Sequence, residues 1–252
     1  MSTLLSGAFV VSEGMVLKVT ASIKATIKEA CNWALLAYQS RGFLESRYGD
    51  QITVIDIDND KRGEFVYVLD RGDSAVVAIA GSNDILDWIR NLIFRKTKCK
   101  RYHAGFSAEL DRIADQILEA VRKTGAKSVL VTGHSRGGGV AIQLVHKYRH
   151  YFPNDLELVV FAAPRALTKK AGWNISNCRF LNVIVGNDLV ASLPLVAWGF
   201  KTYGHVIELG EKLSLWCRAL RYTHAVKNKV KPTLKGIKDH LPAAYSKAVG
   251  KL

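Results

Sequence analysis

The stretch that decides the fold reads Val129-Leu-Val-Thr-Gly-His-Ser-Arg-Gly-Gly-Gly-Val-Ala-Ile142, an apolar run that passes through a Gly-x-Ser-x-Gly turn into a helical pattern. Ser135 lies between Gly133 and Gly137. A β-carbon at either glycine would collide with the neighbouring strand or helix. A serine at the head of a helix can act as a nucleophile, because the helix dipole and nearby N–H groups, including that of Arg136, stabilise a developing oxyanion. The same pentapeptide also occurs in ordinary turns, so its context must decide.

Length and composition indicate one globular domain. The 252 residues are 48% hydrophobic, which is enough for one substantial core, and no linker-like stretch divides them. We therefore expect a single domain over residues 1–252.

Cysteine usage and the N-terminus predict the compartment. The four cysteines form no Cys-x-x-Cys pair, and Met1-Ser-Thr-Leu-Leu lacks the basic start of a secretory signal. Apolar stretches such as Ala191 to Phe200 are half as long as the roughly 20 residues that span a bilayer. We expect reduced thiols and a protein that is cytoplasmic or peripheral at a membrane surface.

The chain is strongly basic, with a formal net charge of +14. With eleven Lys or Arg against three Asp or Glu, residues 201–252 carry +8 of it. Such a surface favours anionic partners, and we expect peripheral contact with an anionic membrane or lipid surface. Nucleic acid is disfavoured, because zinc-finger spacing, RNP-like aromatic patterns and a basic recognition helix are all missing from the sequence. A solvated basic face that only aids solubility is the alternative.

Strand-like and helix-like patterns alternate along the chain. Helices are expected at about 19–38, 108–123 and 137–149, and β-rich runs at 52–57, 65–69, 75–80, 129–131, 156–162 and 180–185. This order predicts an α/β sheet with helices on both faces, whose chemistry lies at the carboxyl ends of the strands.

Polar residues follow three of these runs. Ser82 follows 75–80, Ser135 follows 129–131, and Asp188 follows 180–185, while His240 lies near the end of the chain. The order serine, acid, histidine is the order that α/β-hydrolases use.

Six blocks of sequence resemble the class 3 lipase family, the fungal triacylglycerol lipase-like branch of the α/β-hydrolases, and occur in the family's order from about residue 75 to the end. They are Val77–Ser82 with Asp87–Leu92, His103–Phe106, Gly133–Gly138, Phe161–Arg165, Asn187–Pro194 and the short stretch His240–Tyr245. The resemblance implies an α/β-hydrolase fold, with a central, mostly parallel sheet and helices on both faces.

The resemblance also implies roles for individual residues. Ser135 would be the nucleophile, His240 the general base and then acid, and Asp188 the carboxylate that orients the imidazole. Ser82 and Arg136 would donate backbone N–H groups to the oxyanion, with an ordinary turn residue as the alternative for Ser82. No metal or organic cofactor is suggested.

The choice of histidine stays open between His240 and His224, although the aromatic residue five positions after His240 favours the former. His103 and His134 fall in segments where a packed, hydrogen-bonded histidine is expected. Asp239 is a rival to Asp188, but a carboxylate next to the histidine in sequence cannot easily reach its ring.

Two further histidines raise the question of a metal. His146 and His150 lie four residues apart on a predicted helix, but without a third ligand we expect both to be surface residues. His205 lies in a segment that resembles a non-catalytic strand of the family.

A lid is predicted over residues 83–101. Its apolar side chains recur at helical spacing and would cover the active site; they are Ile85, Trp88, Ile89, Leu92 and Ile93. The basic run Arg95–Arg101 would then dock on anionic head groups. A fixed core helix followed by a solvated loop is the alternative.

Together these features predict a serine ester hydrolase acting on glycerolipids, of the triacylglycerol lipase, monoacylglycerol lipase or phospholipase A1 type. Two alternatives remain. One is a soluble short-chain carboxylesterase, and the other is a catalytically silent hydrolase scaffold that binds anionic membranes or nucleic acid. Oligomeric state and acyl-chain preference do not follow from the sequence.

Overall fold

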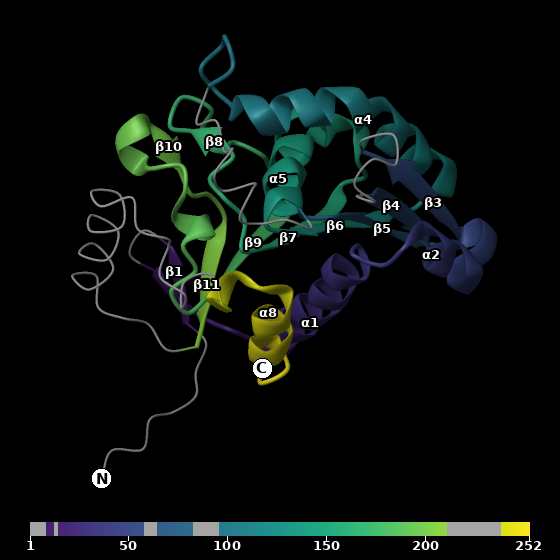
Figure 1. Ribbon diagram of the computed structural model, residues 1–252, viewed down its shortest axis with the longest axis horizontal. Helices are drawn as coiled ribbons and strands as arrows, with labels where there is room; N and C mark the ends of the chain where they lie inside the picture. The colour runs from purple at the N-terminus through teal and green to yellow at the C-terminus, as the bar shows by residue number, and fades with distance from the viewer. Residues whose placement is uncertain (1–8, 13–14, 58–64, 83–95, 211–237) are drawn as a thin grey trace.

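The computed structural model describes residues 9–12, 15–57, 65–82, 96–210 and 238–252 (Figure 1). In this part of the chain a twisted sheet separates two layers of helices. The arrangement agrees with the α/β pattern read from the sequence.

The main sheet has the strand order β2-β1-β11-β9-β7-β6-β5-β4-β3 among the described residues. Its strands are β1 (Phe9–Ser12), β2 (Met15–Lys18), β3 (Ile52–Asp56), β4 (Phe65–Asp70), β5 (Ser74–Ile79), β6 (Ser128–His134), β7 (Asp155–Phe161), β9 (Cys178–Val185) and β11 (His205–Leu209). The five central strands, β5, β6, β7, β9 and β11, run parallel, and the strands on either side pair antiparallel. A separate two-stranded ribbon pairs β8 (Leu167–Thr168) with β10 (Phe200–Lys201).

Helices cover both faces of the sheet, as predicted (Figure 1). On one face lie α4 (Ala104–Thr124) and α5 (Arg136–Tyr148); on the other lie α1 (Ala21–Leu36) and α8 (Pro242–Val249). The short helix α2 (Arg41–Tyr48) packs near β3. Four 3₁₀ turns complete the described structure: η1 (Gly49–Gln51), η2 (Arg149–Tyr151), η3 (Val190–Ser192) and η4 (Val196–Trp198).

The core explains why the central strands are apolar along their whole length. Val131, Leu158 and Val160 face α4 and α5, whereas Val159 and Val183 face α1 and α8. A parallel strand that is covered on both faces has no solvent-exposed side to carry polar residues. The near-continuous valine and isoleucine runs therefore follow from the layer architecture.

The register brings the strand ends together at one edge. Ile79 of β5 pairs with Gly133 of β6, and His134 pairs with Phe161 of β7. The residues that follow these strands consequently start from neighbouring positions, which is where an open α/β sheet carries its chemistry.

The helix expected from residue 108 begins earlier, at Ala104. His103 caps it, because its side chain accepts a hydrogen bond from the backbone N–H of Phe106. The sequence pattern also missed α2 and the β1–β2 hairpin. None of the described helices combines the length and the apolar character that crossing a bilayer requires.

Candidate active site

Ser135 lies in a strained turn between β6 and α5. Its backbone has φ of 55° and ψ of −126°, and its side chain is fully buried. A β-carbon on Gly133 would lie 2.6 Å from the backbone of Gly137, and one on Gly137 would lie 2.1 Å from the carbonyl oxygen of Ile79. The predicted need for glycine at both positions is confirmed.

A continuous chain of hydrogen bonds joins three buried side chains. The distance from His240 Nε2 to Ser135 Oγ is 2.8 Å, and His240 Nδ1 lies 2.9 Å from each carboxylate oxygen of Asp188. Ser135 comes from the β6–α5 turn, Asp188 from the loop after β9, and His240 from the segment before α8. The structure thus brings together the three residues that the sequence singled out, and the carboxylate beside the His240 ring is that of Asp188, whereas the Asp239 carboxylate bonds the backbone of Asn187.

Asp188 is held from several sides. Its carboxylate accepts hydrogen bonds from the backbone N–H of Val190 at 2.8 Å and from the Tyr245 hydroxyl at 2.7 Å. The same hydroxyl accepts from the backbone N–H of Val185 at 3.0 Å. Burial and the neighbouring Asp188 charge raise the pKa of Tyr245 well above its ordinary value, so the phenol stays protonated and donates. Sequence reasoning used Tyr245 only as a marker for His240 and missed this bond.

His134 holds the backbone of the histidine. Its Nε2 lies 3.0 Å from the carbonyl oxygen of His240, which only accepts, so Nε2 carries the proton. Nδ1 then accepts from the Tyr38 hydroxyl at 2.8 Å. Burial lowers the pKa of His134 well below 6.5, which keeps the ring neutral in this arrangement. The expectation of a packed, hydrogen-bonded residue is confirmed.

Asp239 forms a second bond between the loop after β9 and the segment before α8. Its carboxylate accepts a hydrogen bond from the backbone N–H of Asn187 at 2.9 Å. The pairs Asn187–Asp188 and Asp239–His240 are therefore joined twice, once through each carboxylate.

Arg136 makes a contact beside the nucleophile that sequence reasoning missed. Its guanidinium is buried, pairs with Glu109 of α4 at 2.7 Å and donates to the carbonyl oxygens of Ala80 and Gly81 at 3.3 and 3.4 Å. Those carbonyls directly precede Ser82, which is half-buried just past the end of β5. The side chain thus ties the strand end that carries Ser82 to the helix that starts at the nucleophile. An arginine in the first turn of an otherwise apolar helix was the available signal.

The other described histidines differ in their surroundings. His103 is buried at the start of α4, and burial lowers its pKa to about 4. The surface interpretation was wrong for His146, which is half-buried between the Tyr102 hydroxyl and the carbonyl of Gly172, each at 3.1 Å. His150 is exposed as expected, and His205 begins β11. Within the described ranges, no group of three or more His, Cys, Asp or Glu residues could hold a metal ion.

Some predictions cannot be compared with the structure. Residues 83–95 of the expected lid, including Ile85, Trp88, Ile89 and Leu92, lie outside the described residues, as does His224.

Comparison with known proteins gives concordant matches. The pattern of the lipase (class 3) family matches residues 76–198. A secreted mono- and diacylglycerol lipase of Fusarium solani is 29% identical over 146 residues, which cover 50% of this chain and 41% of that protein. A secreted mono- and diacylglycerol lipase of Penicillium cyclopium is 30% identical, over 52% of this chain and 47% of its own length. The chain thus spans less than half the length of these curated relatives.

Solved structures of fungal lipases share the fold. Lipase II from Rhizopus niveus has a TM-score of 0.63 at 21% identity, over 80% of this chain and 82% of that chain. The lipase from Rhizopus microsporus var. chinensis has a TM-score of 0.63 at 18% identity, over 75% of each chain. These likenesses confirm the predicted α/β-hydrolase fold.

The curated relatives correct the predicted compartment. Both curated relatives are secreted lipases, which contradicts the expectation of a cytoplasmic or membrane-peripheral protein. That expectation depended on cysteine spacing and on the first residues of the chain. Neither feature fixes where a folded α/β-hydrolase works, because this fold needs no disulfide to bury its core.

Proposed function

Residues 76–198 belong to the lipase (class 3) family, and from this premise we propose that the protein is a serine hydrolase that cleaves the ester bonds of acylglycerols. The observation that carries the proposal is the buried hydrogen-bonded chain from Ser135 through His240 to Asp188. We propose further that residues 1–252 work as one catalytic domain.

Each member of this chain has a chemical task. A serine hydroxyl is a weak nucleophile, so His240 Nε2 accepts the proton of Ser135 while Oγ forms a bond to the ester carbonyl carbon. Collapse of the tetrahedral intermediate breaks the carbon–oxygen bond, and the imidazolium gives its proton to the leaving alkoxide. Water, deprotonated by the same imidazole, then attacks the acyl-enzyme. Cleavage of the bond between the acyl carbon and Ser135 Oγ releases the fatty acid, and the imidazolium returns its proton to Oγ. Asp188 holds Nδ1–H and stabilises the positive ring at each stage.

The developing oxyanion needs donors that are already in position. We assign them to the backbone N–H of Ser82 and the backbone N–H of Arg136 at the start of α5, where the helix dipole adds to their effect. Loss of one such donor typically costs about 100-fold or more in kcat. The contacts of Arg136 with Ala80 and Gly81 support the assignment, because they tie the two donors to one buried group.

The relatives are mono- and diacylglycerol lipases, which supports partial acylglycerols as substrates here. Triacylglycerols and phospholipids cleaved in the phospholipase A1 manner are finer alternatives. The formal charge of +14 supports peripheral contact with anionic lipid and keeps the phospholipid alternative in view. A soluble short-chain esterase would show the same chemistry without any response to lipid aggregates.

A fluorophosphonate that labels active serines tests the proposal. The wild-type chain, Ser135→Ala, His240→Ala and, as a matched control, His224→Ala are treated and their intact masses measured, alongside release of fatty acid from monoacylglycerol and phosphatidylglycerol. We expect one adduct in the wild type and in His224→Ala and none in the other two. Loss of labelling in His224→Ala with retention in His240→Ala would reverse the choice of base, and no adduct in any chain would remove the hydrolase proposal.

A further inference from the structure

Three segments that are separate in sequence share an unusual charge pattern. Residues 96–103, 164–173 and 194–204 contain eight Lys or Arg and no Asp or Glu. The cations are Lys96, Lys98, Lys100, Arg101, Arg165, Lys169, Lys170 and Lys201. A cluster of one sign without any acid raises the local potential and attracts anions.

Backbone hydrogen bonds join the three segments into one surface. The N–H of Thr168 donates to the carbonyl of Arg101 at 2.9 Å, and the N–H of Lys169 donates to the carbonyl of Gly199 at 2.9 Å. The β8–β10 pairing completes the connection, and Figure 1 shows the two strands side by side at one end of the molecule. We call residues 96–101, 167–170 and 196–201 the basic ribbon surface.

The outer side of the basic ribbon surface combines exposed cations with exposed apolar groups. Lys98, Lys100 and Lys170 are exposed, as are Lys96 and Lys169. Beside them, Val196 is 47% exposed and Trp198 is 41% exposed. Among the large hydrophobic side chains of the described residues only five are this exposed, and two of them lie here within three positions. Exposed apolar groups rimmed by cations are typical of surfaces that meet lipid.

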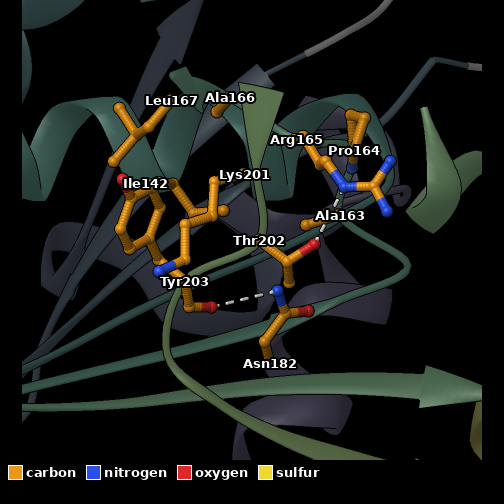
Figure 2. A pocket seen from close by; sticks show the side chains of 10 residues that line it. All are labelled: Ile142, Ala163, Pro164, Arg165, Ala166, Leu167, Asn182, Lys201, Thr202 and Tyr203. Atoms are coloured by element: carbon orange, nitrogen blue, oxygen red, sulfur yellow. Dashed lines mark hydrogen bonds between the residues drawn. The ribbon is translucent and has the colours of Figure 1, made fainter. Parts of the chain in front are cut away.

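The inner side is fixed to the body of the protein. A small pocket lies there, and Figure 2 shows the hydrogen bond that joins Arg165 to Thr202 among the residues that line it. Its guanidinium donates to Thr202 Oγ1 at 3.0 Å and to the carbonyl of Pro194 at 2.9 Å, and Asn182 of β9 donates to the carbonyl of Tyr203 at 3.4 Å. Arg165 is therefore committed to the fold, and the five exposed lysines carry the outward charge.

A short stretch of chain connects the candidate active site to the basic ribbon surface. Asp188 accepts a hydrogen bond from the backbone N–H of Val190, the first residue of η3, and the chain runs from Asp188 to Trp198 in ten residues. The N–H of Arg165 also donates to the carbonyl of Leu193 within that run. Docking through Trp198 would consequently hold the edge of the sheet that carries Asp188 close to the docked surface.

We propose that the basic ribbon surface docks the protein on anionic phospholipid, with the lysines on the head groups and Trp198 and Val196 in the acyl boundary. The proposal deepens the proposed function by naming how lipid is presented to the site. Lipid is favoured over nucleic acid because the patch includes exposed aliphatic and indole groups, which nucleic acid phosphates do not solvate.

Binding of an inactive chain tests the proposal without turnover. Ser135→Ala protein is mixed with vesicles of phosphatidylcholine alone or with phosphatidylglycerol, and the bound fraction is measured by flotation. The patch variant adds Lys98→Glu and Lys170→Glu. The matched control adds Lys28→Glu on α1 and Lys247→Glu on α8, which change the net charge equally on helices that cover the opposite face of the sheet from α4 (Figure 1).

We expect the patch variant to bind phosphatidylglycerol vesicles at least about 25-fold more weakly, since each of the two lost cations contributes about 1 kcal/mol, or roughly fivefold, and the new carboxylates add repulsion. The control should change by less than about threefold, and circular dichroism melting should show that both chains fold. Trp198→Ala, added alone to the Ser135→Ala chain, should also weaken vesicle binding, but without changing the salt dependence of that binding.

Three outcomes would overturn the proposal: no binding to phosphatidylglycerol by the starting chain, equal loss in both charge variants, or loss of binding to a short DNA duplex without loss of vesicle binding. None of them depends on hydrolysis. A failure of the proposed activity would instead show in the labelling experiment with intact Ser135.

Discussion

The nucleophile and the histidine of the candidate site are held in different ways. Ser135 lies inside the β6–α5 junction, where glycines let the backbone of α5 approach β5 and β6. His240 lies just before helix α8, where its carbonyl oxygen accepts a hydrogen bond from His134 and its ring donates one to Asp188. The position of Ser135 is thus a property of the packed core, and the position of His240 is a property of a few hydrogen bonds. Changes near the first should cost stability, and changes near the second should cost activity in a folded protein.

The largest expected effect is on the histidine. His240→Ala removes the group that accepts the Ser135 proton, and we expect kcat for a soluble p-nitrophenyl ester to fall by about 10⁵-fold or more, with little change in Tm. The exposed His150 gives the matched control, since His150→Ala should leave both values unchanged. If His240→Ala unfolded the protein, the contrast between the two sides would be lost.

The nucleophile side should respond to one added methyl group. The β-carbon of Gly137→Ala would meet the carbonyl oxygens of Ile79 and Ala80 at 2.1 and 2.6 Å, which only a backbone shift relieves. We expect the free energy of unfolding to fall by at least about 4 kcal/mol in urea denaturation. Gly42→Ala in α2 is the control, because nothing lies within 4 Å there and a small gain of about 0.5–1 kcal/mol is expected. Equal effects at the two glycines would contradict the packing account.

The free energy of unfolding should also depend on pH, through the buried His103. Burial lowers the pKa of His103 from 6.5 to about 4, so between these values the unfolded chain binds a proton that the folded chain does not. Stability therefore falls as the pH drops below 6.5. His103→Asn keeps a side chain that caps α4 but cannot titrate. Between pH 7 and pH 5 we expect this variant to lose about 2 kcal/mol less unfolding free energy than the wild type. Parallel curves for the two chains would show that His103 is not the group responsible.

The smallest effect tests the second connection of the histidine segment. Asp239→Ala removes the acceptor for the N–H of Asn187, and we expect kcat to fall about 10-fold because the two loops lose one of their mutual bonds. Asp239→Asn keeps an acceptor oxygen and should restore most of the rate. Thermal unfolding measured in parallel separates the cases, since a loss of Tm that matched the loss of rate would make Asp239 a stability residue instead.

Local patterns predicted the central layers well. The runs from Val129 and Leu156 are apolar and bounded by turn residues. This pattern is typical of strands buried on both faces of a parallel sheet, and both runs form such strands. The positions of Ser135 and Asp188 were predicted because each follows the end of an apolar strand, β6 and β9 respectively, and such an end is visible in sequence.

Features that depend on distant partners escaped the sequence reasoning. The β1–β2 hairpin exists in the sheet because β1 pairs with β11, about 195 residues later in the chain. The half-buried state of His146 depends on Tyr102 and Gly172, which no helical periodicity reveals. Similarly, the bond from Tyr245 to Asp188 needs the register of α8 against β9, which short motifs do not encode.

The buried pair of Arg136 and Glu109 predicts a trade-off between thermal stability and activity. Buried ion pairs are commonly no more stabilising than well-packed apolar residues of the same volume, so a screen for heat resistance should tend to replace both by Leu or Met. Such a replacement would release the carbonyls of Ala80 and Gly81, and with them the strand end that carries Ser82. Selection for heat resistance alone should thus yield variants with a higher Tm and a lower kcat. Selection that also measures turnover in every round should retain Arg136.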